Sequence, residues 1–236
     1  MSKHLKRLAM PATWPLARKG SKFVTKPNPG PHSLEHGMAL NSVLKEMLGW
    51  AKTSKETKLI LNNGLITVDG KVRKELKFPV GLMDVLKNQK TGETFRIILN
   101  SKGKLHLLKI KGQEENIKPC KIIRKQMTKG GKIQITLHDG RNLLTDNNDY
   151  KVGDTLIIEL PSGKPIQHLK LEKGTFVMIT KGKHSGEFGK LLEIVGEKSI
   201  EDTKILLESN GQKFETLKDY AFVIGKEKPL INLPEQ

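Results

Sequence analysis

Prolines and positive charges are concentrated at the start of this chain. Of its 236 residues, the first 31 contain five of the eleven prolines: Pro11, Pro15, Pro27, Pro29 and Pro31. Seven Lys or Arg residues precede Glu35, the first acidic residue. Because proline fixes φ and removes a backbone donor, this segment should run extended and build neither sheet nor long helix. We therefore predict an extended basic arm over residues 1–40, which buries little and lies along the phosphates of a polyanion.

The charge of the whole chain also indicates a polyanion partner. Its formal net charge is +17, which is large for an ordinary soluble enzyme of this length. Residues 1–26 carry +7, 27–100 carry +4, 101–170 carry +7, and 171–236 carry −1. The basic surface should therefore belong to the first three segments. Length and charge together favour two or three small domains over one large core.

The sequence contains no recognisable catalytic or cofactor-binding pattern. A single cysteine, Cys120, excludes an internal disulfide and a multi-cysteine zinc site, and we expect it to be a core residue. His32 and His36 have helical spacing, but the surrounding prolines disfavour a helix, so we predict no metal site. Neither a Walker loop nor a dinucleotide fingerprint occurs. We predict no catalytic residues, no cofactor, no small-molecule substrate and, because apolar runs are short, no membrane association.

Residues 41–100 predict two helices followed by a hairpin. Asn41 is expected to cap a first helix with apolar positions at helical spacing up to residue 51. Thr53 and Glu56 form a capping box for a second helix, which should end at Gly64. Leu59 and Ile60 of that helix should face the hairpin. Asp69-Gly70 predicts a type I′ turn between strands 65–68 and 71–74.

The rest of the chain predicts short strands separated by glycine-rich turns. Strands are expected at 105–110, 121–124, 133–137 and 155–160, forming a central barrel over residues 101–170. A second small barrel over 171–228 should contain strands at 175–180, 190–195, 204–208 and 220–224, with a tail at 229–236. The expected fold class is thus α+β and multidomain: a basic arm, a helix–helix–hairpin module and two small β-barrels.

Three basic segments are candidates for contacting nucleic acid. Lys52, Lys55 and Lys58 recur every three residues along one helix face, which in isolation is typical of a solvated surface. The adjoining basic hairpin and the net charge favour phosphate binding instead. Trp14 is either a core anchor or a base-stacking residue, and both interpretations stay open. The candidate contacts are Lys3, His4, Lys6, Arg7, Trp14, Arg18, Lys19, Lys22, Lys52, Lys55, Lys58, Lys71, Arg73, Lys74, Lys181, Lys183 and His184.

These segments resemble a known ribosomal family. His4–Pro11, Trp14–Leu16 and Pro27–His32 are similar to the N-terminal signature of the e-type family of small-subunit ribosomal protein four, found in archaea and eukaryotes. Lys52–Lys74 resembles the RNA-binding domain shared by bacterial small-subunit protein four, pseudouridine synthases and tyrosyl-tRNA synthetases. Residues 173–189 are similar to a KOW motif. Without a long C-terminal extension, the chain looks more archaeal than eukaryotic.

The resemblance implies a structural constituent of the small ribosomal subunit in the cytoplasm. Such a protein binds ribosomal RNA through its arm and RNA-binding module, has neighbouring small-subunit proteins as partners, and takes part in translation and subunit assembly without catalysis or homo-oligomerisation. Two alternatives are an RNA-modifying enzyme with this module appended and a KOW-type transcription or translation factor. The near-neutral last segment leaves open whether the 181–184 loop contacts RNA or protein.

Overall fold

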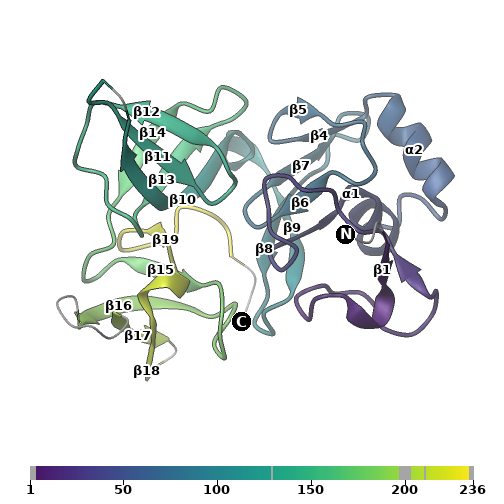
Figure 1. Cartoon of the computed structure of the whole chain (residues 1–236). Helices are drawn as coiled ribbons and strands as arrows, with labels where there is room; N and C mark the ends of the chain where they lie inside the picture. Colours follow the sequence, from purple (N-terminus) through teal and green to yellow (C-terminus); the bar gives the residue numbers. More distant parts are fainter. Residues whose placement is uncertain (1–3, 129, 197–202, 210, 234–236) are drawn as a thin grey trace. The chain divides into compact units, whose positions relative to one another are not determined.

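The structure is a computed structural model that describes residues 4–128, 130–196, 203–209 and 211–233 (Figure 1). The chain divides into two compact units. The first comprises residues 1–98 and 104–116, and the second comprises 99–103 and 117–236. The described residues are mostly β, with two short α-helices, so helix takes a smaller share than the α+β expectation. None of the helices in these ranges is both long and apolar enough to cross a membrane.

A five-stranded sheet organises the first unit. Its strands are β4 (Ile66–Val68), β5 (Lys71–Val72), β7 (Val85–Asn88), β8 (Thr94–Leu99) and β9 (Leu105–Ile110), in the order β5-β4-β7-β8-β9. The strand expected at 105–110 therefore exists, but it closes this sheet rather than starting the central barrel. A Lys109–Glu93 ion pair of 2.6 Å and a bond from Leu105 N–H to the Thr13 carbonyl hold it there. The short helix η3 (Gly112–Asn116) follows.

The first predicted helix differs from its expected form. A short strand, β3 (Gly37–Ala39), pairs with β6 (Pro79–Gly81) and leads into α1 (Leu40–Ser42) and the π-helix η2 (Val43–Met47). Asn41 is not the N-cap; it lies inside α1, and Ala39 holds the cap position. The Asn41 amide instead donates to Thr25 Oγ1 at 2.7 Å and Ser54 Oγ at 3.2 Å. These longer-range bonds replace the local cap.

The second helix, α2 (Ser54–Asn62), begins as its sequence predicts. The Thr53 hydroxyl accepts from Glu56 N–H at 3.3 Å, and the Glu56 carboxylate accepts from Lys52 N–H at 2.8 Å. Thr57 and Leu61 form its buried face. The expectation that Leu59 meets the hairpin was wrong, because this side chain is 63% exposed.

Two local turn predictions in this region are confirmed. Gly64 has φ 71°, the left-handed geometry expected after the helix. Asp69 and Gly70 have φ 51° and 74°, as a type I′ turn requires at both central residues, and strands β4 and β5 flank them.

The N-terminal segment is folded, which corrects the prediction of an arm that buries little. Strand β1 (Leu5–Lys6) pairs with β2 (Phe23–Val24), and the 3-10 helix η1 (Arg7–Ala9) follows β1. Trp14 is only 1% exposed, and its indole N–H lies 3.1 Å from both the Leu34 and the Gly37 carbonyl oxygens. Met10, Leu16 and Val24 are also buried. Prolines prevent extensive pairing here, but they do not prevent apolar side chains from packing.

The second unit contains two five-stranded antiparallel sheets. The first has the order β12-β11-β10-β13-β14 and consists of β10 (Ile117–Met127), β11 (Ile133–Leu137), β12 (Asn142–Thr145), β13 (Thr155–Glu159) and β14 (Pro165–Leu169). Residues 117–121 of the long β10 pair with β13, whereas its later residues pair with β11. The register shifts between Ile122 and Arg124. The two ends of β10 therefore pair with different neighbouring strands of the sheet.

The second sheet has the order β18-β17-β16-β15-β19. Its strands are β15 (Phe176–Ile179), β16 (Phe188–Val195), β17 (Lys204–Ser209), β18 (Gln212–Leu217) and β19 (Ala221–Gly225), with η4 (Lys218–Tyr220) before the last. Strands were predicted close to β15, β16, β17 and β19. Sequence analysis missed β12, β14 and β18, whose half-exposed residues give weak periodicity.

Strand β13 contributes side chains to two hydrophobic clusters of the second unit. Leu156 and Ile158 point into one cluster, together with Cys120 and Ile135. Ile157, between them in sequence, belongs to a second cluster that contains Val177 and Val223. Strand alternation thus places one strand in both cores. The boundary predicted near residue 170 therefore runs through a single compact unit.

Candidate nucleic-acid interface

Helix α2 and the β4–β5 hairpin present a group of exposed lysines in the first unit. Lys55 and Lys58 are exposed on α2, Lys52 directly precedes its N-cap, and Lys71 and Lys74 are exposed on the hairpin. Apart from Lys52, which lies near Glu56, these ammonium groups form no ion pair with any residue that the structure describes. Their charges are therefore available to an external anion.

The hairpin packs against the end of α2. A Cβ added to Gly64 would lie 3.6 Å from Val72 Cγ1, and Arg73 N–H donates to the Ile66 carbonyl at 3.2 Å. The Arg73 guanidinium lies 4.3 Å from the centroid of the Phe78 ring. Arg73 is consequently half-buried and engaged in a cation–π contact, unlike its lysine neighbours.

Arg7 and Trp14 are corrections to the candidate list. Arg7 is buried and forms a two-pronged ion pair with Glu46, with N–O distances of 2.9 and 3.0 Å, and it also donates to the Ala17 carbonyl. Trp14 is a core anchor, which decides between the two interpretations that its sequence context allowed. Neither side chain is accessible to a nucleotide, because both are used to fold the N-terminal segment.

The remaining N-terminal candidates lie at the surface. His4 packs edge-on against Phe23, with ring centroids 5.4 Å apart, and Lys22 Nζ lies 5.5 Å from that ring. Arg18 donates to the Leu8 carbonyl at 2.9 Å. Lys6 and Lys19 are exposed. Lys3 falls outside the described residues.

The 181–189 loop gives a mixed result. Gly182 has φ 85°, as predicted for a tight turn, and Lys181 and Lys183 are exposed. His184 instead stacks on Phe214, with a centroid distance of 4.2 Å and an interplanar angle of 17°, and its Nδ1 lies 3.1 Å from Glu187. One face of the His184 ring is therefore covered within the second unit, and its role as a nucleic-acid contact stays a prediction.

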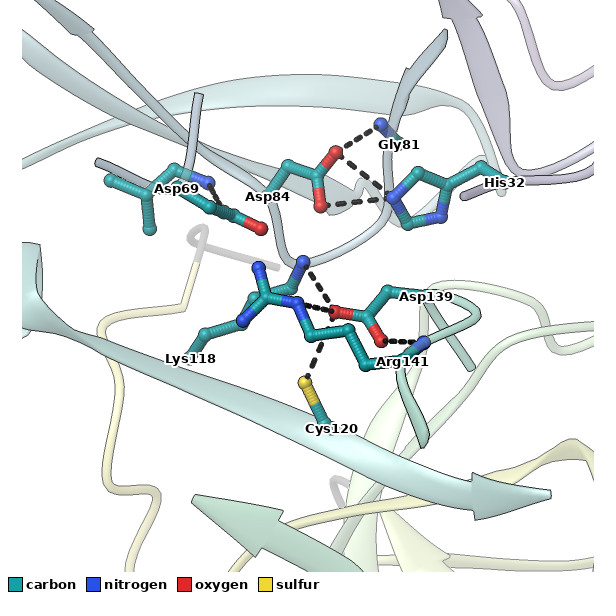
Figure 2. Close-up of polar contacts among 9 residues, drawn as sticks. His32, Asp69, Gly81, Asp84, Lys118, Cys120, Asp139 and Arg141 are labelled. Atoms are coloured by element: carbon teal, nitrogen blue, oxygen red, sulfur yellow. Dashed lines mark hydrogen bonds and ion pairs between the residues drawn. The ribbon is translucent and has the colours of Figure 1, made fainter. Parts of the chain in front are cut away.

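Buried titratable groups of the first unit hold turns in place. His32 Nε2 lies 2.9 Å from both carboxylate oxygens of Asp84, which also accepts from Gly81 N–H at 2.9 Å (Figure 2). Asp69 accepts from Val85 N–H at 3.0 Å. His32, considered above as a metal ligand, therefore connects the proline-rich segment to the turn between β6 and β7.

In the second unit, Asp139 is the centre of a buried polar cluster. Its carboxylate lies 3.1 Å from Lys118 Nζ and 3.1 Å from Arg141 Nε, and the Cys120 thiol donates to it at 3.7 Å (Figure 2). Although burial raises the pKa of Asp139, the neighbouring cations, Lys118 foremost, hold that pKa below its ordinary value. Potential metal-ligating atoms of Cys120, His138 and Asp139 come within 4.8 Å of one another. A metal ion there would face two cations, so the arrangement favours a structural ion cluster.

Lys121 shows that a high lysine count overstates the accessible charge. Its Nζ donates to the Asp219 carbonyl at 2.6 Å, across the two sheets of the second unit. Burial, together with the nearby Lys181 and Lys218, lowers the pKa of Lys121 to about 8, against a smaller opposing effect of Asp219. This half-buried lysine connects β10 to η4, so part of its hydrogen-bonding capacity is used inside the second unit.

The geometry first defines a class of protein, namely one built from small antiparallel β modules. Exposed lysines lie on a helix and a hairpin, whereas other charged groups form ion pairs inside the units. Residues 1–35 match the model of the RS4NT (NUC023) domain, and residues 91–165 match that of ribosomal family S4e. The small ribosomal subunit protein eS4 of Methanocella arvoryzae is 42% identical over 228 residues, covering 97% of this chain and 96% of the relative. The corresponding protein of Methanosphaera stadtmanae is 43% identical over 231 residues, covering 98% and 95%.

A solved structure is similar to this chain in both sequence and fold. The crystal structure of the 30S ribosomal protein S4e from Thermoplasma acidophilum matches with a TM-score of 0.70 and 34% identity, covering 81% of this chain and 96% of that one. The chain therefore belongs to the S4e family of ribosomal proteins, a family of structural proteins and not of enzymes.

Proposed function

We propose that this protein is a structural component of an archaeal small ribosomal subunit that binds ribosomal RNA, contributes to subunit assembly, and acts in translation without catalysis. Relatives named small ribosomal subunit protein eS4, similar over nearly the whole chain, support the assignment. The observation that carries the RNA contact is the group of exposed lysines on α2 and the β4–β5 hairpin. Its partners are small-subunit ribosomal RNA and neighbouring proteins of the cytoplasmic ribosome.

The lysine group fits phosphate binding by simple electrostatics. Each ammonium that neutralises a phosphate releases condensed counterions, which favours association without regard to base identity. Such contacts fix the register and orientation of the protein on RNA, and they leave sequence reading to other groups. Lys55, Lys58, Lys71 and Lys74 suit this role because no described acid neutralises them.

The N-terminal segment supplies a second contact in this proposal. Lys6, Arg18, Lys19 and Lys22 are exposed, while the buried Trp14 fixes the backbone that carries them. A segment that is ordered before binding loses less conformational entropy on the RNA than a disordered arm would lose. The fold of this segment therefore favours its role as a preformed binding surface.

The second unit fits the two expected barrels, and we assign its sheets to them. The register shift in β10 lets one strand pair on both sides, as strands do at the corners of small barrels. The second sheet shows equivalent shifts in β15 and β16. On this assignment, 117–170 corresponds to the central barrel and 171–228 to the KOW barrel.

Sedimentation tests the assignment to the ribosome. A tagged copy of the full chain, expressed in an archaeal host, should sediment with the small subunit at one copy per particle and stay bound in a high-salt gradient. An RNA-modifying enzyme or a KOW-type factor would be released by the salt. Recovery of the tagged protein only in the free fraction would refute the proposal.

A further inference from the structure

Four lysines from three segments of the second unit line one pocket. Its volume is about 490 Å³. Lys170 follows β14, Lys173 precedes β15, Lys190 lies in β16, and Lys226 follows β19. Because the loop with Lys170 and Lys173 is far in sequence from Lys190 and from Lys226, local patterns did not reveal the cluster.

Backbone hydrogen bonds hold the segments that carry these lysines. Gly174 N–H donates to the Leu191 carbonyl at 2.7 Å, and Phe176 N–H donates to the Lys226 carbonyl at 2.9 Å. Gly174 has φ 88°, and a Cβ placed on it would lie 3.8 Å from Lys190 Cε. The left-handed φ is what favours glycine at this turn, which lies within ordinary contact distance of the Lys190 side chain. The lysines are presented by the strand β16 and by the segments that adjoin β14, β15 and β19.

The pocket has an excess of positive charge. Lys173 pairs with Glu193 at 3.0 Å, but both side chains are more than half exposed, so this pair holds the lysine weakly. Lys170, Lys190 and Lys226 form no ion pair with the residues that the structure describes. Glu172 and Glu227 are the two acids in the lining. A concave site with such an excess concentrates anions from solution.

We propose that this pocket binds the phosphodiester backbone of RNA, giving the second unit its own RNA contact. The proposal rests on the proposed function and places an RNA contact in the second unit outside the 181–184 loop. Lysine ammonium groups act as point charges for phosphate oxygens. Apart from the His168 ring, the lining is charged or small and polar, whereas the centre of a protein–protein interface is rich in apolar and aromatic side chains. The composition therefore favours RNA over an acidic protein segment.

The test compares two double variants of the full chain that remove the same charge. Lys190→Ala with Lys226→Ala removes two pocket lysines. The matched control, Lys204→Ala with Lys213→Ala, removes two exposed lysines of β17 and β18 in the same sheet, outside the pocket. Binding to a transcript of small-subunit ribosomal RNA is measured by filter retention between about 50 and 200 mM KCl. Thermal unfolding should be unchanged in both variants, because all four side chains are exposed.

We expect the pocket variant to bind about tenfold or more weakly at about 150 mM KCl, with the salt slope lower by about 1.4 to 1.8. The control variant should change affinity by less than about threefold and keep the wild-type slope. Lys190→Arg with Lys226→Arg should retain wild-type affinity, because it keeps both charges. If the first variant folds poorly, Lys170→Ala with Lys173→Ala, both in a loop, should give the same loss of affinity.

Three results would overturn the inference in distinguishable ways. Equal losses of affinity in the pocket and control variants would mean that only net charge matters, while the proposed function stands. Normal RNA affinity with impaired incorporation into subunits would assign the pocket to a protein neighbour. Wild-type protein that fails to retain the transcript would remove the RNA contact from both the proposed function and this inference.

Discussion

Arg7 and Glu46 are 39 positions apart in the chain and meet in a largely buried ion pair. The guanidinium also donates to the Ala17 carbonyl, so it joins three stretches of the first unit. At the scale of single residues, the role of a cation is decided by such partners. Arg18, eleven positions later, has the same side chain but lies at the surface, donates to the Leu8 carbonyl, and forms no ion pair with the residues that the structure describes.

Replacing Arg7 with alanine should destabilise the first unit by about 2–4 kcal/mol, because it leaves the Glu46 carboxylate without its partner. The matched change Arg18→Ala should alter stability by no more than about 0.5 kcal/mol. Urea unfolding followed by tryptophan fluorescence measures both, since Trp14 is buried in this unit. Equal unfolding midpoints for the two variants would mean that the ion pair contributes nothing.

Glycines of the second unit allow a sharper comparison. Gly186 has φ 90°, and a Cβ there would lie 1.7 Å from the Asn100 carbonyl oxygen. Gly211 has a similar φ of 78°, but nothing lies within 4 Å of its Cβ position. Gly186→Ala should therefore lower the stability of the second unit by more than about 3 kcal/mol, against about 1 kcal/mol for Gly211→Ala. Calorimetric unfolding of the two variants checks this, and similar destabilisation in both would exclude the close backbone approach at Gly186.

Helix α2 combines a locally encoded start with a surface available for binding. Its capping bonds lie within residues 52–56, and its buried face consists of Thr57 and Leu61. Lys55 and Lys58 therefore contribute little to the stability of the element. At the scale of the element, α2 positions the ammonium groups of Lys55 and Lys58. Packing of Thr57 and Leu61 against the rest of the first unit keeps those groups on the exposed face.

Changing Lys55 and Lys58 together to alanine should weaken RNA binding almost equally for all sequences. The salt slope should fall by about 0.7–0.9 for each phosphate that is no longer neutralised. Helix stability should be retained, because alanine is the best helix former. Lys90→Ala with Lys111→Ala removes two exposed charges elsewhere in the first unit and serves as the control. A salt titration in which both variants keep the wild-type slope would identify this helix face as merely solvated.

At the scale of the whole molecule, the chain consists of two compact units with separate cores. The N-terminal segment belongs to the first unit through Met10, Trp14 and Leu16, all buried. Burying each such side chain stabilises the fold by about 1.5–3 kcal/mol. The segment is therefore as much a part of that unit as its sheet.

Deleting residues 1–26 should accelerate amide exchange throughout residues 37–98 and leave the sheets of residues 117–225 unaffected, because only the first unit loses core. Hydrogen–deuterium exchange of the full chain and the truncated chain measures each unit separately. Unchanged protection of residues 37–98 would contradict the packing of this segment. Such a result would instead support the prediction from the sequence that this segment is an extended arm that buries little.

Features determined within a few residues were predictable from the sequence. The capping box at Thr53, the left-handed Gly64 and the Asp69-Gly70 turn depend on backbone geometry that neighbouring side chains impose. Strand β11 was predictable from its alternating side chains, and β13 from its short run of apolar residues. The basic character of the chain, on which the proposed RNA binding depends, follows from its net charge.

Tertiary structure alone decided which side chains those local elements leave accessible. Arg7 became a core ion pair, His32 a buried partner of Asp84, and Leu105–Ile110 a strand of the first sheet. The four lysines of the pocket came together from three segments. The physical reason is that burial and charge pairing depend on which distant segments meet, whereas propensity and capping act only along the chain.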